Sequence, residues 1–223
     1  MRTAWILASG TELTLGQSVD TNSGWIAQQL AALGVRCTRV MLAPDDLDAV
    51  RSAIVQAAGS ADVVVITGGL GPTDDDLTRA ALALATGEEL GLDPASLEQI
   101  RAWFARRNRE MPERNQSQAL RPASSTALEN AQGTAPGILA QVAGRPVFAL
   151  PGVPAEMRAM FATHVAPRVS AATGGRVLLS RRIGTHGLPE AEVGQRLADL
   201  MARGRDPEVG TTASSGIISV RIN

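Results

Sequence analysis

The sequence predicts an α/β protein whose core is a mostly parallel, doubly wound β-sheet. Three apolar runs, at residues 5–8, 35–42 and 62–66, alternate with segments whose apolar residues recur at helical spacing. Short connections join them, which favours parallel strands linked by right-handed crossovers. The third run is apolar after its first residue, as expected for a strand that is covered on both faces.

Composition restricts the possible classes of protein. The 223 residues are 44% hydrophobic, enough for one large domain or for one domain with a smaller companion. The net charge of -1 gives no overall field that would favour nucleic acid or an acidic membrane. The sequence contains no lysine, which excludes a Walker lysine, a Schiff-base lysine and a lysine nucleophile.

Cysteine and histidine usage argues against several kinds of site. The single cysteine, Cys37, excludes an intrachain disulfide and disfavours a zinc–cysteine site. His164 and His186 stand too far apart in the sequence to suggest a histidine metal site. The apolar N-terminal run is too short for a signal peptide, and no run is long enough to span a membrane. We therefore expect a cytoplasmic protein that makes no membrane contact.

The first two strands are separated by a single predicted helix. A tight loop at 9–12 and an irregular stretch at 13–19 precede it. Asp20 is a good N-cap for a helix over 21–33, and Gly34 ends that helix as a C-cap.

A second helix and a Gly-rich turn follow. Asp45 and Asp46 open the helix, and Gly59 is expected just after its end. The third strand then leads into the turn at 67–76 and a further helix at 77–84.

The middle of the chain combines a helical stretch with a hairpin. Residues 88–121 are Arg-rich and helical in pattern, with stops at Pro94 and Pro112, and their arginines are typical of a solvated helix face. Strands at 138–142 and 146–150 form the predicted hairpin.

A smaller unit closes the sequence. A rigid loop at 151–154 starts a helix at 155–161, and small residues at 171–175 indicate a linker. Beyond it we predict, in order, a strand, a helix and two strands, at 177–183, 190–203, 209–213 and 217–222. This piece is small for an independent core, so we expect a truncated domain or one that a partner chain completes.

The turn at 67–76 reads TGGLGPTDDD and is the main functional candidate. A strand, a Gly-rich turn and a helix N-terminus together form an arrangement that binds phosphate in α/β proteins. Asp74, Asp75 and Asp76 stand where the phosphate is expected. Acidic residues in a first helical turn stabilise the helix, which accounts for one or two of them. The alternative is a hard divalent cation shared between carboxylates and phosphate oxygens.

Further polar residues follow the first strand. Glu12 is expected in the same cleft, because the carboxyl ends of parallel strands meet at one edge of a sheet. Asp20 is more simply an N-cap, and Asn22 either holds a ligand or supports that cap. The sequence has neither a GxGxxG turn nor a GxSxG elbow. We therefore expect no NAD, no haem and no serine nucleophile.

Six motifs extend over nearly the whole chain. They are GTEL at 10–13, GQ at 16–17, DTN at 20–22, TGGLGPTDDDLT at 67–78, GTAPG at 133–137 and LPGVPAEM at 150–157. Together they resemble the competence/damage-inducible protein A (CinA) family.

The resemblance implies both fold and activity. It implies a three-layer, molybdopterin-binding-type α/β fold over residues 1–172 and a small, incomplete KH-type α+β domain over 176–223. The implied activity is metal-dependent hydrolysis of a nucleotide-sugar pyrophosphate, such as ADP-ribose, to AMP and ribose 5-phosphate. The implied metal is Mg, Mn or Co, helped by K. The nicotinamide mononucleotide deamidase domain of longer members has no counterpart here, so we expect no deamidase activity.

The residues and the resemblance together suggest roles for the candidate site. We assign the metal to Asp74, Asp75 and Asp76, with Asp75 leading, and catalytic roles to Asp75, Glu12 and Glu156. Glu12 or Glu156 would orient the attacking water as general base. The predicted ligand- and phosphate-binding residues are Gly10, Thr11, Asn22, Thr67, Gly68, Gly69, Gly71, Pro72, Thr73, Gln118 and Gly152.

One departure from the family pattern bears on activity. Many members have an arginine where this chain has Ser117. If that arginine grips a phosphate, Arg114 or Arg121 would have to replace it. The alternative function is therefore a non-catalytic molybdopterin- or nucleotide-binding module that acts through assembly. We expect a small-molecule nucleotide ligand and a homodimer, and no nucleic-acid partner, because the tail lacks an evident Gly-x-x-Gly clamp.

Overall fold

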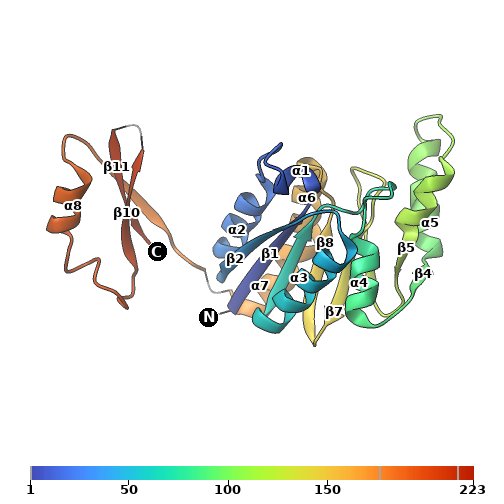
Figure 1. Cartoon of the computed structure of the whole chain (residues 1–223), viewed down its shortest axis with the longest axis horizontal. Coiled ribbons are helices and arrows are strands. Elements are labelled where there is room, and N and C mark those ends of the chain that lie inside the picture. Colours follow the sequence, from blue (N-terminus) through green and yellow to red (C-terminus); the bar gives the residue numbers. More distant parts are fainter. Residues whose placement is uncertain (1, 176, 215) are drawn as a thin grey trace. The chain divides into compact units, whose positions relative to one another are not determined.

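The computed structural model describes residues 2–175, 177–214 and 216–223. The chain divides into two compact units, Met1–Arg176 and Val177–Asn223, which Figure 1 colours from blue to orange and from orange to red. Within the described residues, no helix is long and apolar enough to cross a membrane.

A six-stranded sheet forms the centre of the first unit, with the order β2-β1-β3-β8-β7-β6. Its strands are β1 (Arg2–Ser9), β2 (Val35–Ala43), β3 (Val63–Thr67), β6 (Thr126–Leu128), β7 (Gly137–Val142) and β8 (Arg145–Leu150). Strands β2, β1, β3 and β8 are parallel, whereas β7 is antiparallel to both its neighbours. The predicted mostly parallel sheet and the 138–142/146–150 hairpin are confirmed.

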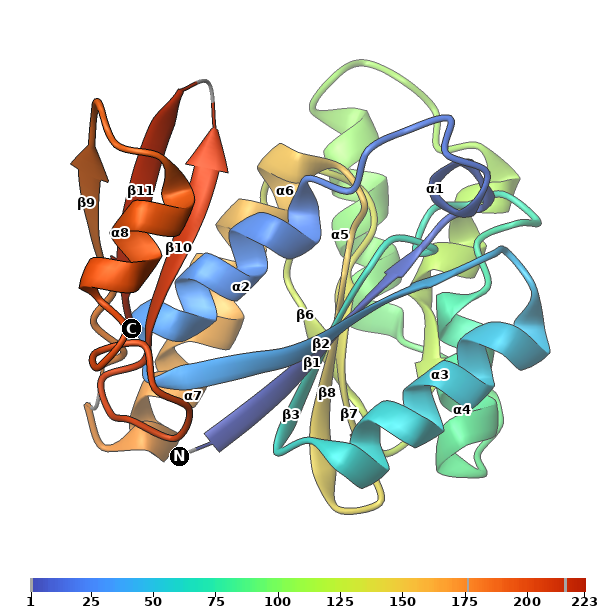
Figure 2. The ribbon, with the colours of Figure 1, turned by 60° about the vertical axis from the view of Figure 1, so that its left-hand side comes forward.

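Helices cover both faces of this sheet, which confirms the three-layer architecture (Figure 2). One layer contains α2 (Asn22–Ala32), α6 (Pro154–Met160) and α7 (Ala166–Thr173), with a π-helical turn, η2 (Phe161–Val165), between the last two. The other contains α3 (Leu47–Ser60) and α4 (Thr78–Thr86). Each layer packs on its own apolar core.

Alternation along the strands divides the side chains between the two cores. In β1, Trp5 and Leu7 pack toward α3 and α4, whereas Ala4 and Ile6 pack toward α2 and α7. Successive side chains of a strand point to opposite faces, so a strand that is apolar throughout must be covered on both. This explains why the continuous apolar runs of the sequence lie in the middle of the sheet.

The predicted helix caps occur with small shifts. Asp20 Oδ1 accepts a hydrogen bond from the Ser23 amide at 2.9 Å, and Asp46 Oδ1 accepts one from the Ala49 amide at 2.8 Å. Gly59 does not follow α3 as predicted but lies inside it, because the helix continues to Ser60.

The Arg-rich stretch at 88–121 contains less helix than its pattern predicts. It contains β4 (Leu90–Leu92), α5 (Pro94–Ala105), a 3-10 helix, η1 (Glu113–Ala119), and β5 (Leu120–Pro122). Pro94 starts α5 rather than stopping a helix, because the first helical position needs no N–H donor. Strands β4 and β5 pair antiparallel.

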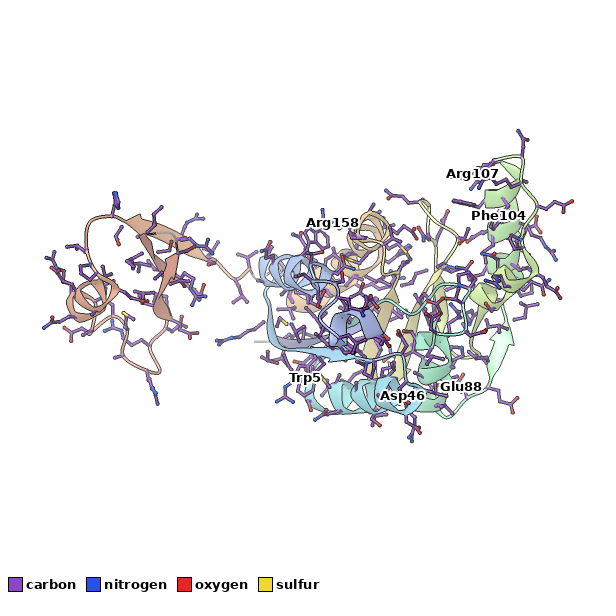
Figure 3. All side chains as sticks on the ribbon, turned by 45° about the horizontal axis from the view of Figure 1, so that its top comes forward. Trp5, Asp46, Glu88, Phe104, Arg107 and Arg158 are labelled. Atoms are coloured by element: carbon purple, nitrogen blue, oxygen red, sulfur yellow. The ribbon has the colours of Figure 1, made fainter. Side chains whose placement is uncertain are left out.

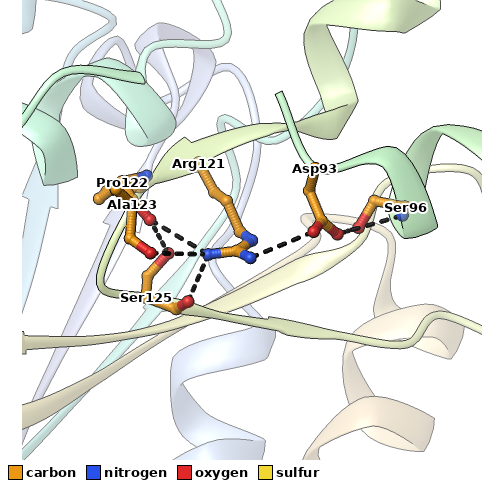
Figure 4. Close-up of polar contacts among 6 residues, drawn as sticks. All are labelled: Asp93, Ser96, Arg121, Pro122, Ala123 and Ser125. Carbon is orange, nitrogen blue, oxygen red and sulfur yellow. Dashed lines mark hydrogen bonds and ion pairs between the residues drawn. The ribbon is translucent and has the colours of Figure 1, made fainter. Parts of the chain in front are cut away.

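A polar network anchors the start of α5 to β5 (Figure 4). Asp93 accepts hydrogen bonds from the Ser96 hydroxyl at 2.5 Å and the Ser96 amide at 3.1 Å. Its other oxygen pairs with Arg121 Nη2 at 3.1 Å. Arg121 also donates to the Pro122, Ala123 and Ser125 carbonyl oxygens. The position of α5 therefore depends on one shielded ion pair.

The second unit is a three-stranded antiparallel sheet, β10-β11-β9, with one helix. Its elements are β9 (Arg181–Thr185), α8 (Glu190–Arg196), β10 (Val209–Ser214) and β11 (Ile217–Ile222). The predicted strand at 177–183 was placed too early, because pairing with β11 begins only at Arg181. The predicted helix at 190–203 was too long. Val193, Ile218 and Val220 form a small core.

We predict that Asp93→Asn destabilises the first unit at neutral pH. Hydrogen bonding from Ser96, followed by Arg121, lowers the pKa of the Asp93 carboxyl. A carboxyl whose folded-state pKa is lowered adds stability above its ordinary pKa, and this is lost as pH falls through the folded value. Urea unfolding should therefore show a gap between wild type and variant that narrows from about pH 5 to about pH 2. A gap that stays constant with pH would contradict this role.

Candidate functional site

A cleft of about 460 Å³ opens where parallel strands β1, β3 and β8 end. The chain passes from β1 to β2 on one side and then to β3 on the other, so the cleft lies at the switch in strand order. The predicted site residues that line it are Gly10, Glu12, Gly68, Gly69, Gly71, Pro72, Asp75, Asp76, Gln118, Gly152 and Glu156.

Other predicted site residues lie outside this cleft. Asn22 and Thr67 line a smaller hollow of about 200 Å³, which shares Ser9, Glu12 and Gly68 with the cleft. Thr11, Thr73 and Asp74 line neither space. Of the three consecutive aspartates, two therefore face the cleft.

Acidic side chains dominate the cleft. Five carboxylates line it, and none of the described residues that line it is an arginine or a histidine. The five are Glu12, Asp45, Asp75, Asp76 and Glu156. An anionic ligand would meet like charge here from several sides, and only a bound cation reverses that repulsion.

The Gly-rich turn approaches other backbone too closely for larger residues. Gly68 has a φ of 101°, and a Cβ there would lie 2.4 Å from the Ser9 carbonyl oxygen. The Gly68 amide donates to the Leu150 carbonyl at 3.1 Å, and its own carbonyl accepts from the Thr78 hydroxyl at 2.8 Å. These contacts place the turn between the ends of β1 and β8.

Asp76 organises the turn rather than the helix that follows it. Its Oδ1 accepts from the Gly71 amide at 2.7 Å, and its Oδ2 accepts from the Thr73 amide at 2.8 Å and hydroxyl at 2.6 Å. Helix α4 begins at Thr78 and has no acidic residue in its first turn. The interpretation of these aspartates as caps of α4 is therefore wrong. Two turn amides predicted to bind phosphate, Gly68 and Gly71, already donate within the protein.

The Arg79 side chain donates hydrogen bonds to the same turn. The residue is 5% exposed, and its guanidinium donates to the Leu70 and Gly71 carbonyl oxygens at 2.7 and 2.6 Å. Burial lowers the pKa of Arg79, and the charge of Asp76 opposes that shift. Sequence reasoning missed this role, because Arg79 there appears only as one position of an amphipathic helix.

Asp75 differs from Asp76 in being exposed. The single proton of the Thr73 hydroxyl goes to Asp76 Oδ2, and an exposed aspartate carboxyl has an ordinary pKa of about 4. The group therefore stays ionised at neutral pH at the wall of the cleft.

Asn22 joins the loops that follow β3 and β8. Its Nδ2 donates to Thr67 Oγ1 at 3.0 Å and to the Gly152 carbonyl at 2.8 Å. Thr67 Oγ1 in turn donates to the Pro151 carbonyl at 3.1 Å. Among the described residues, Asn22 Oδ1 and the Ser9 hydroxyl are buried without a hydrogen-bond partner. The side chains of Asn22 and Thr67 thus join the segments that form this side of the cleft.

Two further carboxylates are fixed by neutral donors. Asp45 Oδ2 accepts from the Thr11 amide at 2.8 Å, while the Asp45 amide donates to Thr11 Oγ1 at 3.0 Å. Glu156 Oε2 accepts from Asn130 Nδ2 at 2.6 Å. Asp45 was expected only to open α3. Its place just after a parallel strand was the signal that it belongs to the cleft.

Gln118 and Ser117 are neighbours with different surroundings. Gln118 is buried, lines the cleft and accepts from Asn115 Nδ2 at 2.8 Å. Ser117 is half-buried and donates to the Arg114 carbonyl at 2.7 Å. Of the arginines considered as substitutes, Arg121 is committed to the Asp93 network.

The donor set fits a hard divalent cation only in part. In the described part of the chain, no three His, Cys, Asp or Glu side chains lie close enough to hold a metal ion. Oxygen ligands suit Mg²⁺ or Mn²⁺, and Mg²⁺ commonly takes one or two carboxylates with phosphate oxygens completing its shell. The described residues of the cleft therefore offer separate carboxylates rather than a preformed site of three ligands.

Comparison with known families decides the classification. A model of the probable molybdopterin binding domain matches residues 5–171, and a model of the damage-inducible protein CinA KH domain matches residues 180–223. The chain belongs to the CinA family.

Individual relatives agree with this assignment. A CinA-like protein of Thermomicrobium roseum is 43% identical over 219 residues, covering 98% of this chain and 54% of the relative. The chain spans about half the length of the curated relatives it matches. A crystal structure described as protein CinA with unknown function, from Thermoplasma acidophilum, aligns with a TM-score of 0.70 at 33% identity, covering 75% of this chain and 98% of that one.

A more distant structure supports the fold alone. A molybdopterin biosynthesis protein from Mycobacterium abscessus aligns with a TM-score of 0.53 at 20% identity, covering 78% of this chain and 94% of that one.

We predict that Arg79→Met destabilises the chain while Arg51→Met does not. The first change removes both charged donors from buried carbonyl groups and should lower the free energy of unfolding by about 1.5–3 kcal/mol. Arg51 is exposed on α3, so its substitution should stay within about 0.5 kcal/mol. Urea unfolding of the two variants measures the difference. Equal midpoints would show that the turn does not depend on Arg79.

Proposed function

We propose that the first unit hydrolyses the phosphoanhydride of a nucleotide-sugar pyrophosphate such as ADP-ribose, giving AMP and ribose 5-phosphate, with a divalent cation. The observation that carries this proposal is the acidic cleft at the carboxyl ends of β1, β3 and β8. A cleft of this charge takes a phosphorylated ligand only together with a cation. It also places carboxylates where a water molecule can be oriented.

Asp75 is the cation contact in this proposal. It is exposed at the cleft wall, where an aspartate carboxyl is ionised at neutral pH. Asp76 has both carboxylate oxygens engaged by turn donors, and Asp74 does not line the cleft. When bound, Mg²⁺, Mn²⁺ or Co²⁺ would neutralise phosphoryl oxygens and acidify a coordinated water.

Glu156 and Glu12 are the candidates for general base. Both line the cleft, and Glu156 is fixed in orientation by Asn130 Nδ2. A carboxylate at either position accepts a proton from the water that attacks phosphorus, while the departing phosphate oxygen leaves on the opposite side. The base is the residue whose change to glutamine removes the acidic limb of the kcat–pH profile.

A binding module without turnover is the second candidate. The amides of Gly68 and Gly71 already donate within the protein, and no arginine lines the cleft among the described residues. These features weaken the hold on a transferring phosphoryl group. The same cleft would then bind a pterin or nucleotide phosphate and act through assembly.

We expect Asp75→Asn to reduce metal-dependent turnover strongly and leave the fold intact. Loss of the cation contact removes several kcal/mol of transition-state stabilisation, so turnover of ADP-ribose should fall roughly a hundredfold. Asp74→Asn is the matched control, because it removes the same charge one position away without altering the cleft wall. Product release is measured with Mg²⁺, Mn²⁺ and Co²⁺ in turn.

Two outcomes separate the proposals. Unchanged turnover in Asp75→Asn would remove Asp75 from the mechanism. Saturable binding of ADP-ribose by the unaltered chain, with no product under any of the three metals, would reject hydrolysis and favour the binding module.

A further inference from the structure

A second hollow, of about 110 Å³, adjoins the acidic cleft. Helix α5 supplies one wall through Gln99, Trp103 and Arg106, and the loop between β6 and β7 supplies the other. Thr134 lines both this hollow and the cleft, so the two spaces meet there. We call the hollow the α5 groove.

The chemistry of the α5 groove differs from that of the cleft. It combines the Trp103 indole ring, the Arg106 guanidinium and the Gln99 carboxamide. Flat aromatic and guanidinium surfaces stack on heterocyclic bases, and amide groups bond to base edges. Glu129 is the one carboxylate among the described residues that line the groove, and it offers an acceptor for an exocyclic amino group.

Trp103 is held in place by stacking. The Arg107 guanidinium carbon lies 3.6 Å from its ring centroid, and the Phe104 ring meets it edge-on at 5.2 Å. Figure 3 shows Phe104 and Arg107 on the same end of α5. The Trp103 Nε1–H has no hydrogen-bond partner among the described residues. This buried donor is therefore unused within the described part of the protein, while the ring position is set by Arg107 and Phe104.

The opposite wall of the α5 groove is tied to the cleft. Asn130 Oδ1 accepts from the Gln132 and Gly133 amides at 3.0 and 2.9 Å. Asn130 Nδ2 donates to the Ala135 carbonyl at 3.0 Å and to Glu156, a carboxylate of the cleft, at 2.6 Å. One side chain thus shapes the groove and orients a cleft carboxylate. The groove wall and the cleft carboxylate are therefore fixed relative to each other before a ligand that spans both spaces binds.

We propose that the α5 groove binds the nucleobase of a nucleoside phosphate whose phosphate groups lie in the acidic cleft. This inference rests on the proposed function only in placing phosphate in the cleft. A neutral, flat base gains stacking area in the groove and avoids the repulsion that the phosphates meet among the five carboxylates. The groove therefore anchors the uncharged end of the ligand.

The test compares two ligands that differ by a base. AMP carries one, and ribose 5-phosphate does not. Dissociation constants are measured by calorimetry on the full chain with Mg²⁺ present. The variants are Trp103→Leu and Arg106→Gln, and the control is Arg101→Gln, an α5 arginine that does not line the groove.

We expect Trp103→Leu and Arg106→Gln each to raise the Kd for AMP about tenfold, which is typical for loss of a stacking partner. Their Kd for ribose 5-phosphate should stay unchanged, and Arg101→Gln should match wild type for both ligands. Trp103→Phe keeps an aromatic face and should restore most of the AMP affinity, even if Trp103→Leu is poorly folded.

Three results would overturn the inference. The first is that the unaltered chain shows no AMP binding. The others are that the groove variants have the same AMP affinity as the control, or that they lose affinity for AMP and ribose 5-phosphate equally. Failure of the proposed hydrolysis looks different: AMP binding would still depend on Trp103 and Arg106, while ADP-ribose would yield no product. The groove would then serve a binding module.

Discussion

The site depends on the way one irregular turn is held between a buried strand and a helix. Residues 68–77 belong to neither a strand nor a helix, so their backbone polar groups need partners from side chains. Arg79 satisfies two carbonyl groups from below, Asp76 satisfies two amides and a hydroxyl from within, and Thr78 takes a third carbonyl. With those groups engaged, Asp75 is left charged and exposed at the cleft. By engaging these groups, Arg79 and Asp76 leave Asp75 as the aspartate of the turn that is exposed to a ligand in the cleft.

Hydrogen bonds from neutral side chains join the other segments that form the cleft. Asn22 hydrogen-bonds to Thr67 at the end of β3 and to Gly152 after β8. Thr11 hydrogen-bonds to Asp45, and Asn130 hydrogen-bonds to Glu156. None of these ties uses a cationic side chain. Negative charge therefore gathers at the strand ends with no cationic side chain in these contacts, while the hydrogen bonds keep the loops in place.

The sequence predicts the fold well where periodicity is the signal. Continuous apolar runs give β1 and β3, and the turn at 67–76 gives the centre of the cleft. Prediction was poorer where hydrogen bonds inside irregular backbone decide the outcome, as for Asp76 and Arg79, because such bonds join residues with no periodic relation. Residues 88–121 were misread because their short strands β4 and β5 carry too few residues to alternate. The early placement of β9 has another cause, since its start is set by pairing with β11 rather than by its own residues.

None of the described residues that line the cleft is cationic, so the proposed function would make cation and anion binding mutually dependent. By thermodynamic linkage, whatever factor a bound cation adds to nucleotide affinity, the nucleotide adds to cation affinity. A cleft lined by arginines would collect phosphate compounds whenever they are present. Under the proposed function, each partner on its own would meet an unfavourable or weak site here, and occupancy would follow the product of their concentrations. The cleft would therefore fill only when the proposed cation and its nucleotide are present together.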